Sequence, residues 1–419
     1  MRWTRVLAAL LVAAGATVRA EDAAQPDEAA RRTAIAKLGR LAWSDYGGPL
    51  AFCDLDGSNV VQSDCLRADW LHWLPDRRRV VTVDGDHVRI VDAATGKSSD
   101  LTANARGGER FVSGHPLLSP DGRHLVVWRT VQPTSTWHDR RSGSLAQQVV
   151  AFALFDLDTG RRADIAPAPV PRTWTDSPIA AWSADSESLY VALGTEPQRL
   201  TRFAPDGTRP ETVATLAPGS RITQIAVDGP RIAFAVRHGP RFEVRDPAGK
   251  TLFFRGDRLL CTALEWEPGG AALLVDAAIY EGPNPSERWR VVPGEPAQQL
   301  PVPWPPRREP SGDPAFEIET RKPDIYSPPL VYLAPVPSGE PVALESHGPV
   351  VRVGGAFVFW RTTTPLRETR RGPTIMSTPA VEDLWCYDPP ARAFVRLTTR
   401  GFSARCWDIA LTPPESRKR

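Results

Sequence analysis

Three long loops hold most of the residues in this sequence that could bind a ligand or take part in catalysis. They separate apolar β-type runs at Val131–Gln148, Ala277–Glu287 and Thr363–Val381. Arginines cluster there beside aromatic rings, and a guanidinium group binds carboxylate or phosphate through two hydrogen bonds and also stacks on rings. The loops therefore favour recognition of an oxyanion or an acidic peptide, with ordinary solvated loop charges as the alternative. The candidate binding residues are Trp137, His138, Asp139, Arg140, Arg141, Tyr280, Glu281, Arg367, Glu368, Arg370 and Arg371.

Catalytic and metal-binding patterns are not legible in the sequence. His138 precedes Asp139, but one such pair in a loop is weak support for acid–base chemistry. The seven histidines show neither His-x-x-x-His nor His-Glu-x-x-His spacing, and no Gly-x-Ser-x-Gly nucleophile motif occurs. The run from Asp54 to Asn59 resembles a calcium loop, but Cys65 stands where an EF-hand needs its bidentate acid, so a turn explains it better. We therefore expect no catalytic residue, no metal and no cofactor.

The elements that must position the three loops are β-hairpins. Between two apolar runs, Pro120-Asp121-Gly122 has the composition of a tight turn, because proline presets φ, aspartate hydrogen-bonds the backbone that follows and glycine takes positive φ at little cost. A second hairpin follows, with its turn at Leu157–Gly160. Two such hairpins in succession predict one four-stranded antiparallel sheet.

This four-stranded unit recurs in weaker form along the chain. At 419 residues the chain is longer than a single core usually allows, so an array of units that share a continuous core explains its length. The units repeat at roughly 35–55 residues, a spacing typical of β-propeller blades. His72 falls between Trp70 and Trp73 on an expected inner strand, where we expect a structural role. The six readable units are Ala68–Thr102, Val112–Ile165, Ile179–Leu216, Ile222–Arg255, Leu259–Pro301 and Val350–Thr398.

The two ends of the chain are expected to complete one further blade together. The opening segment Gly39–Gln62 lacks an inner strand, and Ala404–Pro413 has the pattern of one. Pairing these segments would close the ring and hide the edges of the sheets. The predicted fold class is therefore all-β, a β-propeller of seven clear blades closed by pairing of the C-terminal strand with the N-terminal strands. The stretch Pro303–Glu345 is either an eighth, degenerate blade or an insertion.

Two motifs resemble the repeats of the TolB-type, WD-repeat-like family of exported β-propellers. They are Gly47–Asn59, which reads GGPLAFCDLDGSN, and Leu118–Arg123, which reads LSPDGR. The similarity covers most of residues 39–412. It implies the fold and leaves the activity open, because that family includes periplasmic scaffolds, peptidase propeller domains and sugar-processing enzymes. The chain departs from TolB because only about twenty residues precede the propeller, which is too few for a separate N-terminal domain.

Residues 1–20 have the pattern of a secretory signal peptide. Arg2 and Arg5 precede the apolar run Val6–Ala16, and Val18–Ala20 fits a cleavage site before Glu21. The alternative is a membrane anchor, but the run is shorter than the ~20 residues that a span needs. We expect a short helical lead-in at 21–38, the propeller at 39–413 and a basic tail at 414–419.

Net charge and export limit the classes of partner that the protein is expected to bind. The chain has 51 basic and 49 acidic residues, and the signal peptide contains three of the arginines, so the mature protein has 48 against 49, a net charge of −1. A near-neutral protein lacks the concentrated basic face that a general nucleic-acid binder needs. We expect a periplasmic or secreted monomer with no nucleic-acid partner and no transmembrane segment after cleavage.

Five cysteines are present, and export permits disulfides. Several pairings are possible, and proximity in sequence favours Cys53 with Cys65 and Cys386 with Cys406. Cys261 lies in an apolar run and is expected to be a buried thiol.

Two functions remain open. The first is a non-catalytic propeller that binds a protein, peptide or cell-envelope component through its loop face, similar in manner to TolB. The alternative is a propeller enzyme of the sugar-lyase or hydrolase type, with acids, His and Arg from different blades converging on the central channel. The first is preferred because no catalytic constellation is visible in the sequence.

Overall fold

The fold was analysed in a computed structural model of the chain. The structure describes residues 26–45, 49–84, 87–103, 110–130, 148–172, 179–194, 197–239, 241–256, 259–267, 270–279, 287–300, 307–310, 314–321, 330–346, 350–353, 356–364, 367–371, 374–378, 381–390, 392–398 and 404–411. The expected signal peptide at 1–20 and basic tail at 414–419 lie outside these residues. No helix in the described part is long and apolar enough to span a membrane.

Almost every described element is a β-strand, and the strands form eight four-stranded antiparallel sheets and one two-stranded sheet. What we call the closing sheet contains β34 (Ala404–Leu411), β1 (Gly39–Asp45), β2 (Leu50–Asp54) and β3 (Val61–Gln62). Next come β4 (Trp70–Trp73), β5 (Arg79–Val83), β6 (Val88–Asp92) and β7 (Ser98–Asp100), then β8 (Arg110–Leu118), β9 (His124–Thr130), β10 (Gln148–Asp156) and β11 (Arg162–Arg172), then β12 (Ala180–Trp182), β13 (Leu189–Leu193), β14 (Arg199–Phe203) and β15 (Glu211–Thr215).

The remaining sheets follow in chain order. They contain β16 (Ser220–Asp228), β17 (Arg231–His238), β18 (Arg241–Arg245) and β19 (Thr251–Arg255), then β20 (Leu259–Trp266), β21 (Leu273–Ile279), β22 (Glu287–Val291) and β23 (Gln298–Gln299), then β24 (Arg307–Pro310), β25 (Phe316–Arg321), β26 (Leu330–Pro335) and β27 (Val342–Ala343), then β28 (Val351–Val353), β29 (Ala356–Thr364), β32 (Val381–Asp388) and β33 (Ala393–Arg396). Sheet β24–β27 thus lies within the Pro303–Glu345 stretch. The two-stranded sheet is the hairpin β30 (Arg367–Arg371) and β31 (Thr374–Thr378).

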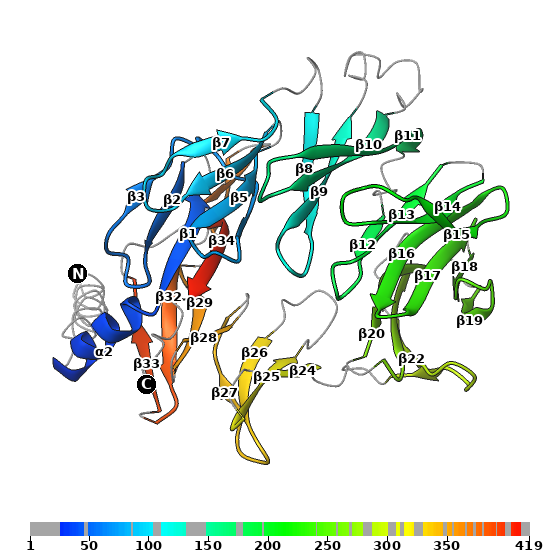
Figure 1. The fold of residues 1–419 in the computed structure, drawn as a ribbon. Coiled ribbons are helices and arrows are strands. Elements are labelled where there is room, and N and C mark those ends of the chain that lie inside the picture. The colour runs from blue at the N-terminus through cyan, green and yellow to red at the C-terminus, as the bar shows by residue number, and fades with distance from the viewer. Residues whose placement is uncertain are drawn as a thin grey trace, which may run out of the picture.

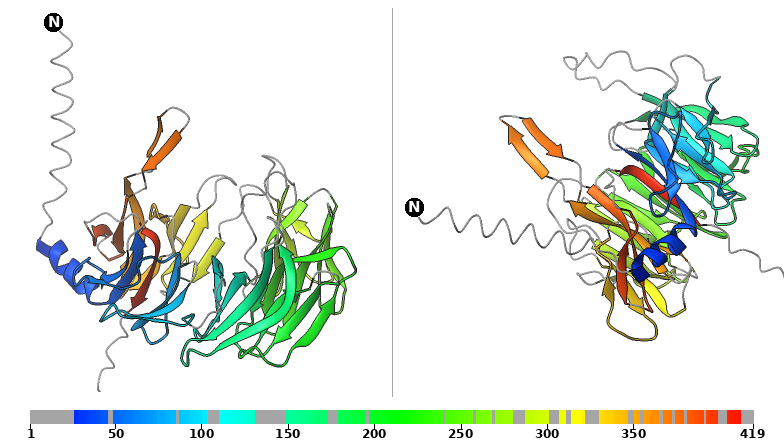
Figure 2. Two further views of the ribbon diagram at one scale, coloured as in Figure 1. Left: turned by 90° about the horizontal axis from the view of Figure 1, so that it is seen from above. Right: turned by 90° about the vertical axis from the view of Figure 1, so that its left-hand side faces the viewer.

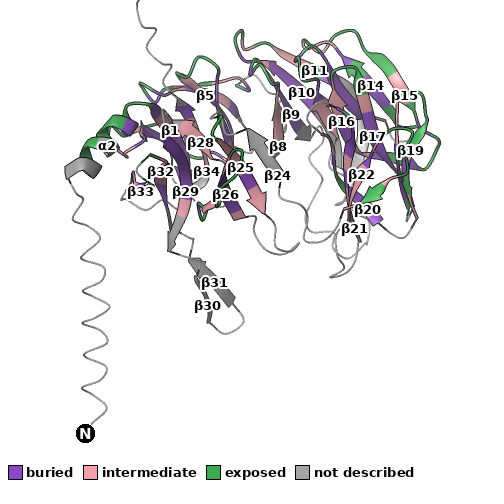
Figure 3. Cartoon of the chain, turned by 90° about the horizontal axis from the view of Figure 1, so that it is seen from below, coloured by how far each residue is buried: buried purple, intermediate pink, exposed green. Residues whose placement is uncertain are grey.

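The architecture is a β-propeller, as the repeated hairpins predict. Figure 1 shows the sheets arranged around a common axis, and in each sheet the strands follow one another outward. The helix α2 (Pro26–Ala36) precedes the closing sheet and buries Ile35 against it. The most buried strands are the second strands of the sheets, such as β5 and β17, whereas every residue of the outermost strand β15 is exposed or intermediate (Figure 3).

The Pro-Asp-Gly turn of the sequence connects β8 and β9. Gly122 has φ of 71°, and its N–H donates to the Ser119 carbonyl at 2.8 Å. The Asp121 carboxylate accepts a hydrogen bond from the Arg123 N–H at 3.1 Å. A Cβ at position 122 would come within 2.7 Å of Pro75, so glycine is needed for both backbone conformation and space.

Pairing of the chain ends is confirmed. β34 runs antiparallel to β1, from the Gly39–Leu411 pair to Asp45–Ala404, and it is the innermost strand of the closing sheet. The blue β1 and red β34 lie side by side in Figure 1. Asp408 of β34 also accepts a hydrogen bond from the Trp73 N–H at 2.9 Å, which ties the C-terminal strand to the next sheet. The two ends therefore close the ring through both a strand ladder and side-chain contacts.

Apolar side chains fill the space between neighbouring sheets. Seven clusters of buried residues each join two adjacent sheets, because alternate residues of a strand face opposite neighbours. These clusters run without a break from β24–β27, through β28–β33 and the closing sheet, and on to β20–β23. Large aromatic side chains such as Phe52, Phe234 and Phe357 are fully buried in them.

One junction differs, and we call it the polar seam. No apolar cluster joins β20–β23 to β24–β27 among the buried residues that the structure describes. The face of β20–β23 turned away from β16–β19 carries an ion pair of Arg288 with Asp276, at 2.6 Å through both guanidinium nitrogens. On β24–β27, the face turned away from β28–β33 carries Arg321, which lies 4.3 Å from the Tyr332 ring and pairs with Glu319. Charges thus occupy the place that apolar side chains fill elsewhere.

The expected disulfides are wrong. Cys53, Cys65 and Cys386 are buried and carry no disulfide. Cys53 packs in the cluster between the closing sheet and β28–β33, whereas Cys65 packs on the opposite side of the closing sheet, against β4–β7. Neighbours in sequence are therefore separated by the sheet itself, and Cys386 is not bonded to Cys406 of β34. Cys261 is buried as predicted, and burial raises the pKa of its thiol to about 12.

Candidate functional site

One face of the propeller gathers the features that could bind a partner. If the strands of a sheet are lettered a to d from the axis outward, the b–c connections and the d–a connections to the next sheet emerge on the same face, which we call the b–c face. The predicted rim loops belong to it. Residues 137–141, 280 and 281 lie outside the described residues, and positions 367–371 form strand β30. The structure therefore does not test whether these candidates converge.

The loop Ser63–Asp69, which joins the closing sheet to β4, presents an exposed leucine on this face. Leu66 is 79% exposed, whereas Cys65 and Ala68 beside it are fully buried. The Cys65 N–H donates to Ser63 Oγ at 2.9 Å, and the Ala68 N–H donates to Ser44 Oγ at 3.1 Å. The loop is thus anchored on both sides of Leu66. Sequence analysis missed Leu66 because no pattern distinguishes an exposed leucine from a buried one.

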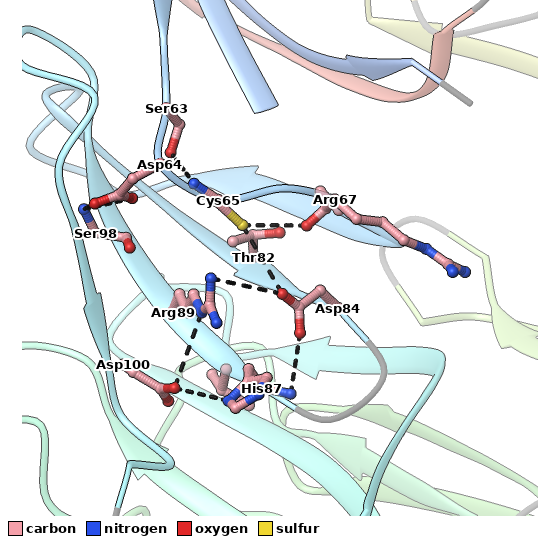
Figure 4. Close-up of polar contacts among 12 residues, drawn as sticks. Ser63, Asp64, Cys65, Arg67, Thr82, Asp84, His87, Arg89, Ser98 and Asp100 are labelled. Carbon is pink, nitrogen blue, oxygen red and sulfur yellow. Dashed lines mark hydrogen bonds and ion pairs between the residues drawn. The ribbon is translucent and has the colours of Figure 1, made fainter. Parts of the chain in front are cut away.

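A cluster of polar residues lies beneath this loop, between the closing sheet and β4–β7 (Figure 4). Arg89 of β6 lies between two carboxylates, with Nη1 3.8 Å from Asp84 Oδ2 and Nε 3.9 Å from Asp100 Oδ2. His87 Nδ1 is 2.7 Å from Asp100 Oδ2, and the His87 N–H donates to Asp84 Oδ1 at 3.1 Å. Cys65 Sγ lies 3.1 Å from the Arg67 carbonyl, which holds the loop over the cluster.

The pKa shifts within the cluster favour a structural role over a catalytic one. Burial raises the pKa of Asp84 despite the nearby Arg89 and His87. Burial also raises the pKa of the Cys65 thiol, so the thiol stays protonated at neutral pH and is a poor nucleophile and metal ligand. For Asp100, hydrogen bonds from Thr102 and the charge of His87 outweigh burial and lower the pKa. The cluster therefore fixes the outer strands and the loop that bears Leu66.

A second constellation, in sheet β16–β19, has the composition of a hydrolytic triad. Ser220 Oγ is 2.8 Å from His238 Nδ1, and His238 Nε2 is 2.9 Å from Glu243 Oε1. Ser220 is only 1% exposed, however, so no substrate can reach its hydroxyl. Arg245 and Thr251 also donate to Glu243, at 2.6 and 2.9 Å. This network stabilises the β17–β18 hairpin, and sequence spacing could not have revealed it because the strand register brings its members together.

Replacing Glu243 with glutamine should lower stability in a pH-dependent way. Burial alone would raise the pKa of Glu243, but hydrogen bonds from Arg245 and Thr251 hold the pKa below its ordinary value. The carboxylate therefore stabilises the fold above the ordinary glutamate pKa of about 4.3, and this contribution is lost as the pH falls through the lowered pKa. We expect Glu243→Gln to cost about 1–3 kcal/mol near pH 7.

Denaturant unfolding of both proteins between pH 3 and 7 measures this difference. The difference in the free energy of unfolding between wild type and variant should become smaller toward pH 3. A gap that is constant across the range would show that the ionised carboxylate contributes nothing specific.

Among the described residues, one histidine–carboxylate pair joins neighbouring inner strands at the central channel. His72 Nδ1 of β4 lies 3.0 Å from Asp408 Oδ2 of β34, and both side chains are partly exposed. The His72 ring stacks on Trp70 at 6.2 Å. Because the same carboxylate oxygen accepts from the Trp73 N–H, Asp408 contributes to ring closure. Over the described part of the chain, no group of three or more His, Cys, Asp or Glu side chains is placed to hold a metal ion.

Comparison with known proteins assigns the chain to no family. No family model and no curated protein matches the sequence. Similar solved structures include an oligogalacturonate lyase in complex with manganese, at 18% identity over 69% of this chain and 83% of that chain, with a TM-score of 0.41. Dipeptidyl peptidase 4 of Porphyromonas gingivalis is 12% identical over 82% of this chain and 55% of that chain, with a TM-score of 0.47. TolB of Acinetobacter baumannii is 16% identical over 62% of this chain and 65% of that chain, with a TM-score of 0.30. Similarities this low say nothing about activity.

Proposed function

We propose that the protein is an exported, non-catalytic β-propeller that acts as a monomer and binds a protein or peptide of the cell envelope through its b–c face, in the manner of TolB-type propellers. The observation that carries the proposal is Leu66, an exposed apolar side chain on an anchored loop. Its export rests on the signal-peptide pattern of residues 1–20.

Leu66 differs from ordinary exposed leucines in how it is held. Single exposed apolar residues are common on protein surfaces. Here, the backbone hydrogen bonds of Cys65 and Ala68 on either side of Leu66 are buried. The polar cluster of Asp84, Arg89 and Asp100 also supports the loop from below. A partner that buries Leu66 gains its transfer free energy, while little conformational entropy is lost because the loop is already ordered.

Substitution of Leu66 should weaken partner binding without unfolding the protein. Burial of a leucine side chain is worth about 1.5–3 kcal/mol, so Leu66→Ala should weaken binding by about 10- to 100-fold, and Leu66→Glu by more. The measurement is capture from envelope extract by immobilised protein, with quantitative mass spectrometry of the retained proteins. The partner is the protein retained by wild type and lost from both variants.

Phe254 provides a matched control. It is also a large exposed apolar residue, at 56%, but it lies within the outermost strand β19 of another sheet and not on a connecting loop. Phe254→Ala should retain the same proteins as wild type. If the Leu66 variants and Phe254→Ala give the same capture profile as wild type, the proposed site is wrong.

The enzyme alternative has one observation in its favour, the His72–Asp408 pair in the channel. A histidine oriented by a carboxylate can act as a general acid or base. Asp408 is already engaged by the Trp73 backbone, however, and among the described residues no group of three or more His, Cys, Asp or Glu side chains is placed to hold a metal ion. Binding is therefore the better-supported function.

A further inference from the structure

The hairpin β30–β31 projects from the ring at the b–c connection of sheet β28–β33. Figure 2 shows it in orange, extending clear of the other sheets. Five residue pairs join its two strands, from Arg367–Thr378 to Arg371–Thr374. Neither strand pairs with any other strand that the structure describes.

From this hairpin we infer that a partner adds an extended, acidic strand to the edge of β30. The inference rests on the proposed binding function and specifies its mode and the chemistry of its partner. It concerns a region separate from Leu66, so the two can be tested apart.

The backbone of β30 is available for strand addition. In an antiparallel pair, alternate residues direct their N–H and C=O groups away from the partner strand. On a strand with only one neighbour, these groups form a template for another extended chain. A two-stranded hairpin alone is at best marginally stable in water, and a third strand adds stability, so the hairpin gains from pairing with a partner.

The charges of the hairpin indicate which of its two edges is used and what kind of strand binds there. β30 has the sequence Arg-Glu-Thr-Arg-Arg, with three positive charges and one negative, whereas β31 is Thr-Ile-Met-Ser-Thr and has none. Charged edges disfavour pairing with unselected strands, and opposite charges at facing positions stabilise a pair. If β30 paired antiparallel with β30 of a second copy, with Thr369 facing Thr369, Arg367 of each copy would face Arg371 of the other. An acidic strand is therefore favoured over self-association.

The hairpin and the Leu66 loop emerge from neighbouring sheets of the ring. Sheet β28–β33 packs on the closing sheet through a shared apolar cluster, and the Leu66 loop leaves the other side of that closing sheet. Both features belong to the b–c face. A single partner could therefore engage Leu66 with an apolar group and β30 with an acidic strand.

The test uses the full chain and a synthetic probe. A blocked peptide of about seven residues that alternates Val and Glu should bind, and the same peptide with Lys for Glu should bind about tenfold more weakly. Fluorescence anisotropy measures the affinity. Hydrogen exchange with mass spectrometry should show slower exchange of residues 367–378 when the Val-Glu peptide is bound.

Variants locate the site. Arg370→Glu with Arg371→Glu should weaken binding of the Val-Glu peptide by about tenfold. The matched control is Arg77→Glu with Arg78→Glu, an adjacent exposed pair on the β4–β5 turn at the opposite face, which should leave the affinity unchanged. Leu66→Ala should also leave peptide affinity unchanged, since the probe has no segment for that loop.

Three results would overturn the inference. They are equal binding of the Glu and Lys peptides, unchanged exchange at 367–378, and concentration-dependent dimerisation through the hairpin in light scattering. If the probe fails to bind while capture of a partner still depends on Leu66, strand addition is wrong and the proposed function stands. If the probe binds and capture does not depend on Leu66, strand addition to β30 stands and the role proposed for Leu66 is wrong.

Discussion

A chain truncated after Ser403 is expected to lose the native ring. It lacks β34, so β1 loses its ladder partner and the closing sheet loses its innermost strand. The apolar cluster at this sheet also loses Trp407 and Ile409, and the Trp73 N–H loses its acceptor Asp408. These losses together exceed about 5 kcal/mol, which is comparable to the whole stability of many domains. Circular dichroism, thermal unfolding and limited proteolysis should show a largely unfolded or protease-sensitive protein.

A chain that ends at Thr412 is the control for this truncation. It keeps all of β34, which ends at Leu411, and should unfold like the full chain. Adding a synthetic peptide of residues 404–412 to the truncated chain should restore part of its protease resistance. If the protein truncated after Ser403 melts at the same temperature as the full chain, closure by β34 does not hold the ring together.

Phe52→Ala is expected to cause the largest loss of stability of any single substitution considered for this protein. Phe52 is fully buried between the closing sheet and β4–β7, and its ring lies 5.8 Å from that of Trp73. Alanine leaves a cavity between two sheets that are each held by strand pairing and cannot easily close the space. We expect the free energy of unfolding to fall by about 3–5 kcal/mol.

Guanidinium unfolding, followed by tryptophan fluorescence, measures this effect, and Phe254→Ala serves again as the comparison. Phe254 is more than half exposed, so its removal should change stability by less than about 0.5 kcal/mol. Similar midpoints for the two variants would contradict the packing described for Phe52.

The hairpins could be predicted because their signals are local, and the ring closure could be predicted because one expected inner strand is missing. The turn at Pro120–Gly122 and the pairing of Gly39–Asp45 with the C-terminal strand follow from turn chemistry and from one missing inner strand. Turn residues act within a few positions, and alternating apolar residues specify the two faces of a sheet whatever lies beyond it. The hairpins can therefore be predicted without knowing which sheets pack beside them.

The site could not be predicted in the same way, because it depends on which sheet face a residue occupies. Cys53 and Cys65 are close in sequence but lie on opposite sides of the closing sheet. Ser220, His238 and Glu243 meet only through the register of β16, β17 and β18, which includes a bulge between Ile222 and Gln224. The composition of the long loops predicted them as binding sites from sequence. Leu66 can be recognised as a candidate only when the burial of its neighbours is known.

The polar seam has a consequence for how the chain could be rearranged. Among the described residues, apolar packing passes through the closing sheet, and no apolar cluster joins β20–β23 to β24–β27. In energetic terms these residues form a curved row of sheets whose first and last members are β24–β27 and β20–β23. A circular permutant with new ends at the polar seam, and a linker from Leu411 to Pro26, would keep Ile35 of α2 in its cluster and break none of the seven apolar interfaces. The sheet that joins β1 with β34 thus lies inside the packed row, and not at either of its ends.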